Sequence, residues 1–249
     1  MRAFSLAGKV AFALTGRCQG QHCTDLVLHR VAIGTGRWKT LRLPFSSAAP
    51  SPSMTASGMS LWIAEAPAAS TSGIARLWAS SDLGAHFVKK RAPCPAVTSI
   101  AAASADALWA VCGGTTPQLR RSSDSGIAWA SVLVPGTLTS AASIAPASAD
   151  VAVLATGTTD ELLRTTDGGK TFRVVTPHGA HGKWAVLHFA TSLAGGALLV
   201  ATATGRTAPT VTTTTATTTA TTTTPRGSVQ LWRTADAGAK WVGPARFGS

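Results

Sequence analysis

The stretch RTTDGGKTF at residues 164–172 occurs four times in the chain with small changes. The other copies are ASSDLGAHF at 79–87, RSSDSGIAW at 121–129 and RTADAGAKW at 233–241. Each copy has a Ser or Thr, an Asp two residues later, a Gly two residues further on, and then a Phe or Trp. A phrase that recurs in this way indicates an internal repeat, and the repeat decides the fold.

The physical chemistry of the phrase predicts a hairpin turn that holds itself together. The Asp can accept hydrogen bonds from backbone N–H groups just ahead of it, and the Ser or Thr adds a hydroxyl. The Gly permits a positive φ, and the aromatic residue enters the next strand and packs against the hairpin or a neighbouring blade. We therefore expect a structural role for these residues, which are Ser80, Asp82, Gly84, Phe87, Ser122, Asp124, Gly126, Trp129, Thr165, Asp167, Gly169, Phe172, Thr234, Asp236, Gly238 and Trp241.

Short apolar runs precede each copy, and a fifth, degraded copy stands at 28–38, LHRVAIGTGRW. Runs such as SLWIA at 60–64 and ALWAV at 107–111 are typical of buried strands, and no sustained helical period is present. A repeat of about 42 residues with four short strands has the size of one propeller blade. The sequence thus predicts an all-β, single-domain β-propeller of about five four-stranded blades, with repeats at 1–48, 49–93, 94–135, 136–177 and 178–249.

The repeated phrase resembles the Asp-box, or BNR, repeat of a family of β-propellers. The family includes sialidases, xyloglucan-cleaving glycosidases, sortilin-type sorting receptors and photosystem II assembly factors. The resemblance implies that the boxes lie on the blade periphery, away from the central face that binds ligands. It also implies six or more blades, so the five repeats either close as a monomeric ring or form part of a larger propeller.

Composition narrows the choice of partner. The 249 residues carry a formal charge of +12, which suits an anionic partner, but the basic residues are scattered and only Lys89, Lys90 and Arg91 form a dense run. We therefore expect no nucleic-acid binding, and a protein or glycan partner instead.

No apolar stretch is long enough for a membrane span. The Thr-rich segment 207–226 has no large apolar residue to pack and is predicted to be a disordered insertion.

The four cysteines leave two alternatives open. Disulfides Cys18–Cys23 and Cys94–Cys112 are expected if the protein is exported, and four reduced thiols if it is cytosolic. An extracytoplasmic or cell-surface location is favoured if an export signal precedes the chain, since the first residues read as strands. Neither zinc spacing nor a nucleotide-binding motif is present, so no metal and no cofactor are expected.

Catalysis would require acidic residues beyond those in the boxes. Glycoside hydrolysis uses a pair of carboxylates, and Glu65 and Asp160 are the candidates, each at the end of a predicted strand. A sialidase mechanism is excluded because it needs a Tyr nucleophile, and the chain has no Tyr. The preferred hypothesis is a non-enzymatic binding or scaffold module, and the alternative is a glycoside hydrolase of the Asp-box propeller type.

Overall fold

The computed structural model describes residues 3–19, 22–46, 49–50, 52–65, 74–157, 161–177, 183–186, 199–202 and 229–246. Every regular element in these segments is a β-strand. In the same segments, there is no helix of the length and apolar character that crossing a membrane requires.

The strands form five antiparallel sheets, which we call blades 1 to 5 in chain order. Blade 1 contains β1 (Ala3–Ala7), β2 (Val10–Gln19), β3 (His22–Ala32), β4 (Lys39–Leu41) and β5 (Ala49–Pro50). Blade 2 contains β6 (Ser53–Ser57), β7 (Ser60–Glu65), β8 (Arg76–Ser80) and β9 (Val88–Lys90). Blade 3 contains β10 (Val97–Ala102), β11 (Leu108–Cys112), β12 (Gln118–Ser122) and β13 (Ala130–Val132). Blade 4 contains β14 (Ser143–Pro146), β15 (Ala152–Ala155), β16 (Leu162–Thr165) and β17 (Arg173–Val174), and blade 5 contains β18 (Lys183–Val186), β19 (Leu199–Thr202), β20 (Val229–Arg233) and β21 (Val242–Arg246).

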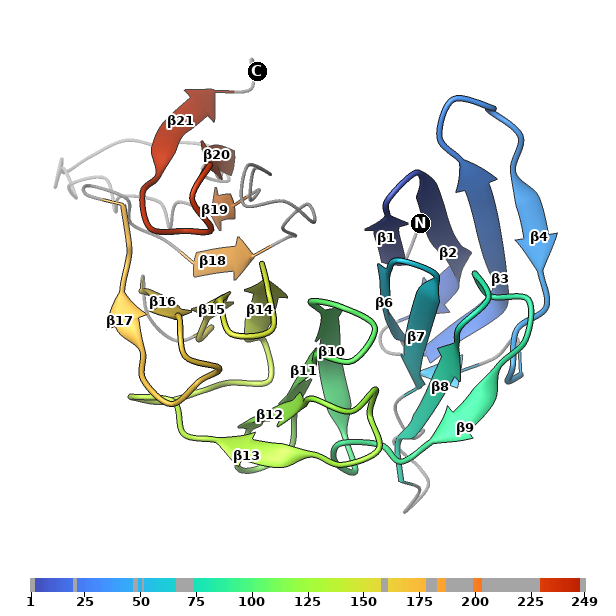
Figure 1. Ribbon diagram of the computed structural model, residues 1–249, viewed down its shortest axis with the longest axis horizontal. Helices are drawn as coiled ribbons and strands as arrows, with labels where there is room; N and C mark the ends of the chain where they lie inside the picture. The colour runs from blue at the N-terminus through green and yellow to red at the C-terminus, as the bar shows by residue number, and fades with distance from the viewer. Residues whose placement is uncertain are drawn as a thin grey trace, which may run out of the picture.

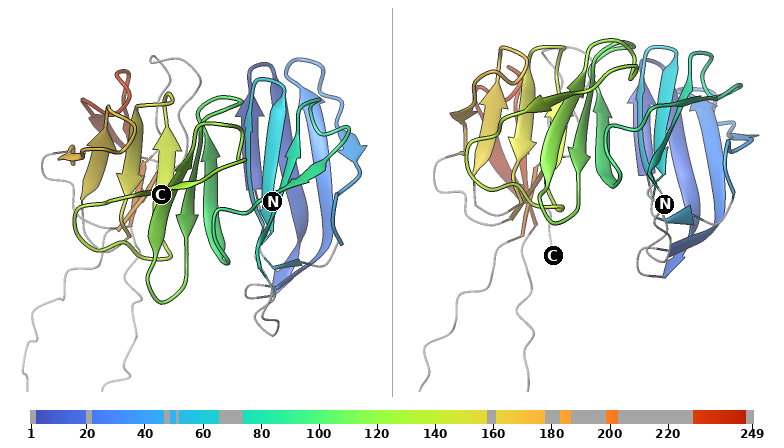
Figure 2. Two further views of the ribbon diagram at one scale, coloured as in Figure 1. Left: turned by 60° about the horizontal axis from the view of Figure 1, so that its bottom comes forward. Right: turned by 90° about the horizontal axis from the view of Figure 1, so that it is seen from below.

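Each blade pairs its four main strands in chain order, and the first strand lies on the inside of the molecule (Figure 1). The five sheets stand side by side along an arc, with β1 and β18 as the first strands of its two end blades (Figures 1 and 2). This is the predicted β-propeller architecture. One detail differs from the expected repeat boundaries: β5 pairs with β3, so Ala49 and Pro50 belong to the sheet of blade 1 rather than to the start of blade 2.

The core lies between adjacent blades, because the second strands of blades 2 to 4 are covered on both faces. Leu61 and Ile63 of β7 pack with Phe12 of blade 1, whereas Trp62, on the opposite face of the same strand, packs with Leu108 of blade 3. This alternation explains why the second strands read as continuous apolar runs rather than as alternating ones. A blade alone would leave both faces in water, so each blade depends on its neighbours.

Hydroxyl side chains accept hydrogen bonds from backbone N–H groups at the free edge of the innermost strands. The Ala56 N–H of β6 donates to Ser5 Oγ of β1 at 2.8 Å, and the Ala102 N–H of β10 donates to Thr55 Oγ1 of β6 at 2.9 Å. An unpaired strand edge exposes N–H groups that would otherwise need water or another strand. Ser and Thr on the inner strands thus join neighbouring blades through hydrogen bonds from backbone to side chain.

Two disulfides are present. Cys18–Cys23 closes the tip of the β2–β3 hairpin, which extends beyond the neighbouring sheets at one end of the molecule (Figure 2). Cys94–Cys112 links the segment before β10 to the end of β11. The Thr-rich segment 207–226, predicted as an insertion, lies outside the described residues.

Candidate functional site

The four box turns share one hydrogen-bond pattern, centred on a buried hydroxyl. In the box of blade 4, Thr165 Oγ1 donates to Asp167 Oδ1 at 2.9 Å and accepts from the Gly169 N–H at 2.8 Å. The equivalent hydroxyls accept from the box glycine at 2.8 to 2.9 Å in the other three turns, and they belong to Ser80, Ser122 and Thr234. The hydroxyl thus supports the turn from inside, as the sequence pattern predicts for its first position.

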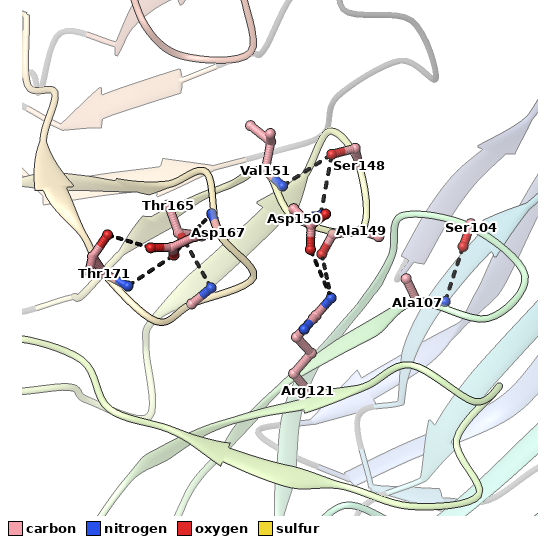
Figure 3. A network of polar contacts seen from close by, with 11 residues as sticks. Ser104, Ala107, Arg121, Ser148, Ala149, Asp150, Val151, Thr165, Asp167 and Thr171 are labelled. Atoms are coloured by element: carbon pink, nitrogen blue, oxygen red, sulfur yellow. Dashed lines mark hydrogen bonds and ion pairs between the residues drawn. The ribbon is translucent and has the colours of Figure 1, made fainter.

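The box aspartates close the outer side of the same turns. Asp167 Oδ1 accepts from the Thr171 N–H at 2.9 Å, and Asp167 Oδ2 accepts from the Thr171 hydroxyl at 2.6 Å (Figure 3). These bonds favour the charged form and hold the pKa of the Asp167 carboxyl well below its usual value. Donors from the same turns, chiefly the N–H four residues ahead, lower the pKa of the other three box carboxyls, Asp82, Asp124 and Asp236.

The box glycine also meets the preceding blade, a contact that the sequence pattern alone does not show. Gly169 has φ +89°, and a Cβ added there would lie 2.7 Å from Val132 Cγ1 and 3.1 Å from the Trp109 ring of blade 3. The aromatic residue of each box packs in the same cluster between its own blade and the preceding one. The box therefore serves as the docking surface between blades as well as a local turn.

An arginine on the third strand of a blade reaches across to the next blade. Arg30 Nη1 donates to the Leu83 carbonyl at 2.9 Å, and Arg164 Nε donates to the Ala237 carbonyl at 2.8 Å. Both acceptors occupy the position between the box Asp and Gly. We call this contact the arginine latch. Both arginines stand directly before the Ser or Thr position of the box phrase. We call this position the arginine column, and it is occupied by Arg30, Arg121, Arg164 and Arg233. Its recurrence indicates a role in blade structure, but the acceptor on another blade can be found only in three dimensions.

Arg121 makes a variant of this latch between blades 3 and 4. Its Nη2 donates to the Ala149 carbonyl at 3.1 Å and to Asp150 Oδ1 at 3.2 Å, in the turn between β14 and β15 (Figure 3). Its Cζ lies 5.6 Å from the ring centroid of Trp109, within the range of a cation–π contact. The Arg121 guanidinium thus contacts a carbonyl oxygen, a carboxylate and an indole ring.

The candidate catalytic pair is not assembled by the described residues. Glu65 ends β7 and is largely covered, with Oε2 3.9 Å from Arg76 Nη1 and 3.4 Å from Trp78 Nε1. Both partners lie on β8 of the same blade, and Glu65 and Arg76 are cross-strand neighbours. Asp160 lies outside the described residues. The contacts of Glu65 are those of a carboxylate that stabilises its own hairpin.

Other carboxylates outside the boxes also have partners within the chain. Asp25 lies 3.9 Å from Arg17, Asp106 accepts from Ser125 Oγ at 2.7 Å, and Asp150 pairs with Arg121. In the described part of the chain, no three His, Cys, Asp or Glu side chains gather in a way that could hold a metal ion.

The cavities lie in two kinds of place. A central cavity of about 140 Å³ lies among the inner strands and is lined by Ser5, Ser53, Thr55 and Ser99 together with apolar residues. The described residues that line it include no charged side chain. Three larger cavities lie along the boundaries between blades, with volumes of about 370 Å³ (blades 2 and 3), 310 Å³ (blades 3 and 4) and 440 Å³ (blades 4 and 5). We call these the interblade grooves.

Known structures share this architecture. No protein-family model matches the sequence, and no match is found among curated proteins. YCF48 bound to D1 peptide is similar over 97% of this chain and 67% of its own, with 12% identity and a TM-score of 0.54. The GH74 xyloglucanase from Xanthomonas campestris is similar over 97% of this chain and 38% of its own, with 16% identity and a TM-score of 0.57. The GH74 enzyme of Niastella koreensis gives 97%, 36%, 14% and 0.60 for the same quantities. At these identities the likeness shows a shared β-propeller fold, and the chain spans only a third to two thirds of the length of these neighbours.

Proposed function

We propose that the chain is a non-enzymatic β-propeller module of the Asp-box type that binds a segment of a partner protein. The observation that carries this proposal is that the carboxylates of the chain form contacts within the fold. Eight of the described acidic residues make hydrogen bonds or ion pairs inside the fold, in boxes, hairpins or turns, and these are Asp25, Glu65, Asp82, Asp106, Asp124, Asp150, Asp167 and Asp236. Carboxylates held in this way support the blades rather than a pair of catalytic groups.

The shape of the surface supports binding of an extended segment. The interblade grooves are lined by box turns, by residues of the outermost strands and by a few side chains with hydrogen-bonding groups, which suits a peptide chain. A propeller of the same fold has been solved with a bound peptide, which is an analogy of fold only. The two disulfides persist in oxidising compartments, so we place the protein outside the cytosol.

Selection from a random peptide library tests this function. Native protein, immobilised with its disulfides intact, is expected to enrich peptides that bind saturably and compete with one another. Reduced and unfolded protein serves as the control and should not enrich them. If the native protein enriches no peptide beyond this control, the proposed function is wrong.

The hydrolase alternative has its own discriminating pair of variants. Glu65→Gln removes the carboxylate but keeps an acceptor for Trp78, whereas Arg76→Gln breaks the same ion pair and keeps the carboxylate. We expect no hydrolysis of a polysaccharide panel by the native protein. Turnover that is lost in Glu65→Gln and retained in Arg76→Gln would show that Glu65 is catalytic and would replace our proposal.

A further inference from the structure

The boundary between blades 2 and 3 lacks the arginine latch. The column that holds Arg30, Arg121 and Arg164 has Ala79 in blade 2. The register is the same in both blades, because Trp62 pairs with Ala79 across β7 and β8 as Trp109 pairs with Arg121 across β11 and β12. Blade 2 thus has the tryptophan that faces the latch position but not the guanidinium.

The groups that would receive a guanidinium are nevertheless present on blade 3. The turn before β11 reads SAD at 104–106, and the turn that receives Arg121 reads SAD at 148–150. Ser104 Oγ accepts from the Ala107 N–H at 3.1 Å, and Ser148 Oγ accepts from the Val151 N–H at 3.1 Å, so the two turns have the same internal bond (Figure 3). Ala105 and Asp106 are therefore the counterparts of the two residues that bind Arg121.

The interblade groove of about 370 Å³ lies at this position. Trp62, Ala79, Ala105 and Ser125 are among the residues that line it. Asp106 lies beside it, since its Oδ1 accepts from Ser125 Oγ. In the part of the chain that the structure describes, no hydrogen bond reaches the Ser125 carbonyl, whose equivalents in blades 2 and 5 accept from Arg30 and Arg164.

We propose that this groove is a binding site for an arginine side chain of the partner protein. Its guanidinium would take the place that Arg121 takes between blades 3 and 4, against Trp62 and within reach of the Ala105 and Ser125 carbonyls and the Asp106 carboxylate. A planar fork of N–H donors suits this arrangement of acceptors and a ring, whereas an ammonium group suits it less. That the cation belongs to a polypeptide rests on the proposed function.

Charges near the groove decide whether a cation can enter. Asp82 lines it and remains ionised, because its turn holds its pKa well below the usual value, and Asp106 lies next to it. Lys90 and His86 also line the groove, and Lys90 opposes a second cation. Charges farther away than the Debye length, about 8 Å in physiological salt, are largely screened. The groups next to the groove therefore decide whether a cation enters it, rather than the net charge of +12.

The test compares two blocked tripeptides, acetyl-Gly-Arg-Gly-amide and its citrulline analogue, which has the same shape without the charge. We expect the native protein to bind the arginine peptide at one saturable site, detected by chemical shifts of the Ala105 and Ser125 amides. The affinity for the citrulline peptide should be weaker by about tenfold or more. Equal affinity for the two peptides, or no saturable site in the native protein, would overturn the proposal.

Variants at the latch position make the test quantitative. Ala79→Arg supplies the missing guanidinium from within the chain, so it should abolish the site and raise the melting temperature. Ala141→Arg adds the same charge at an exposed position that lines none of the interblade grooves, and should leave binding within about twofold of the native value. If Ala79→Arg binds the arginine peptide as the native protein does, the site lies elsewhere and the proposal is wrong.

Two further variants keep the proposal testable if Ala79→Arg fails to fold. Lys90→Met removes the opposing charge from the groove and should tighten binding, whereas Asp106→Asn keeps the acceptor for Ser125 and should weaken it. Failure of both variants to change the affinity would contradict the assigned position. A peptide library that yields no binder, together with a functional arginine site, would refute the proposed function alone, so the two failures are distinguishable.

Discussion

At the scale of single residues, the box depends on a hydroxyl that is almost fully buried. Thr165 is 1% exposed and bonds both the Gly169 N–H and the Asp167 carboxylate. A buried N–H without an acceptor costs about 1–3 kcal/mol. The sequence pattern predicts that this hydroxyl supports the turn, and the structure shows it buried and bonded to the box glycine.

Replacing Thr165 by Val should therefore destabilise the protein by about 2 kcal/mol, because Val keeps the shape and leaves the Gly169 N–H without its acceptor. Thr166→Val, at the exposed neighbouring position, is the control and should change the free energy of unfolding by less than about 0.5 kcal/mol. Urea unfolding followed by tryptophan fluorescence measures both. Equal losses in the two variants would contradict the assigned role of the buried hydroxyl.

The box carboxylates predict a specific dependence of stability on pH. Each has a pKa in the folded protein below its ordinary value of 3.8, so the unfolded chain binds protons first as the pH falls. Their contribution to stability is thus complete above about pH 5, and it is lost as the pH falls below 3.8 towards the lowered pKa values.

The replacement Asp167→Asn tests this dependence. In thermal melts across the acid range, the variant should have a lower melting temperature than the native protein at neutral pH. The difference should shrink as the pH falls, since protonation removes the same charge from the native turn. A difference that stays constant from neutral to acid pH would show that the charge of Asp167 does not contribute.

At the scale of elements, the contact between blades is built on the box glycine. Gly169 and Gly34 both have a strongly positive φ, +89° and +95°, but only Gly169 has side chains of another blade against it. A Cβ at Gly34 would meet nothing within 4 Å. The two positions therefore separate the conformational cost of a side chain from the cost of overpacking.

We expect Gly34→Ala to destabilise the protein by about 1–2 kcal/mol, the cost of a left-handed conformation. Gly169→Ala should cost a further 1–3 kcal/mol or so, because the added Cβ collides with Val132 and Trp109. Equilibrium unfolding in urea gives both values. A loss at Gly169 no greater than that at Gly34 would mean that blade 3 yields without cost.

The arginine latch predicts a second effect at the same scale. Arg164→Met keeps the apolar stem and removes the bond to the Ala237 carbonyl, and should cost about 1–2 kcal/mol. Arg173 is its exposed cross-strand neighbour, so Arg173→Met removes the same charge without a latch and should cost less than about 0.5 kcal/mol. If the two variants are equally stable, the latch contributes only through net charge.

The sequence predicts what is local within a blade and fails for what crosses between blades. The spacing of Ser80, Asp82 and Gly84 predicts the box turn, because all of its bonds join residues within a few positions of one another. The acceptor of Arg30 lies 53 residues away, on a different blade, and no periodicity indicates it. For the same reason, the sequence does not show why Ala79 matters. Ala79 stands where the other copies have Arg, and the effect of that difference depends on the turn of blade 3 that faces it.

At the scale of the whole molecule, the blades interact in sequence, and the outward face of blade 1 has no blade in front of it in the described structure. The exposed apolar residues of blade 1 include Phe4, Ile33 and Trp38, which are 48%, 55% and 49% exposed. In blades 2 to 5 the aromatic residue at the position of Trp38 packs against a preceding blade. Apolar groups that are arranged to meet a blade favour association with any surface that resembles one.

We therefore expect the purified chain to associate weakly and reversibly, with an average mass that rises with concentration in light scattering. Ile33→Lys replaces one of these exposed apolar side chains by a charged one and should bring the mass back to that of a monomer. Its melting temperature should stay close to the native value, since Ile33 is more than half exposed.

Ile127→Lys is the matched control, because Ile127 is exposed to a similar degree, at 63%, but lies in a box turn of blade 3. A constant monomeric mass for the native chain would show that blade 1 is covered in solution by blade 5 of the same chain. An equal response of both variants would attribute the association to charge alone.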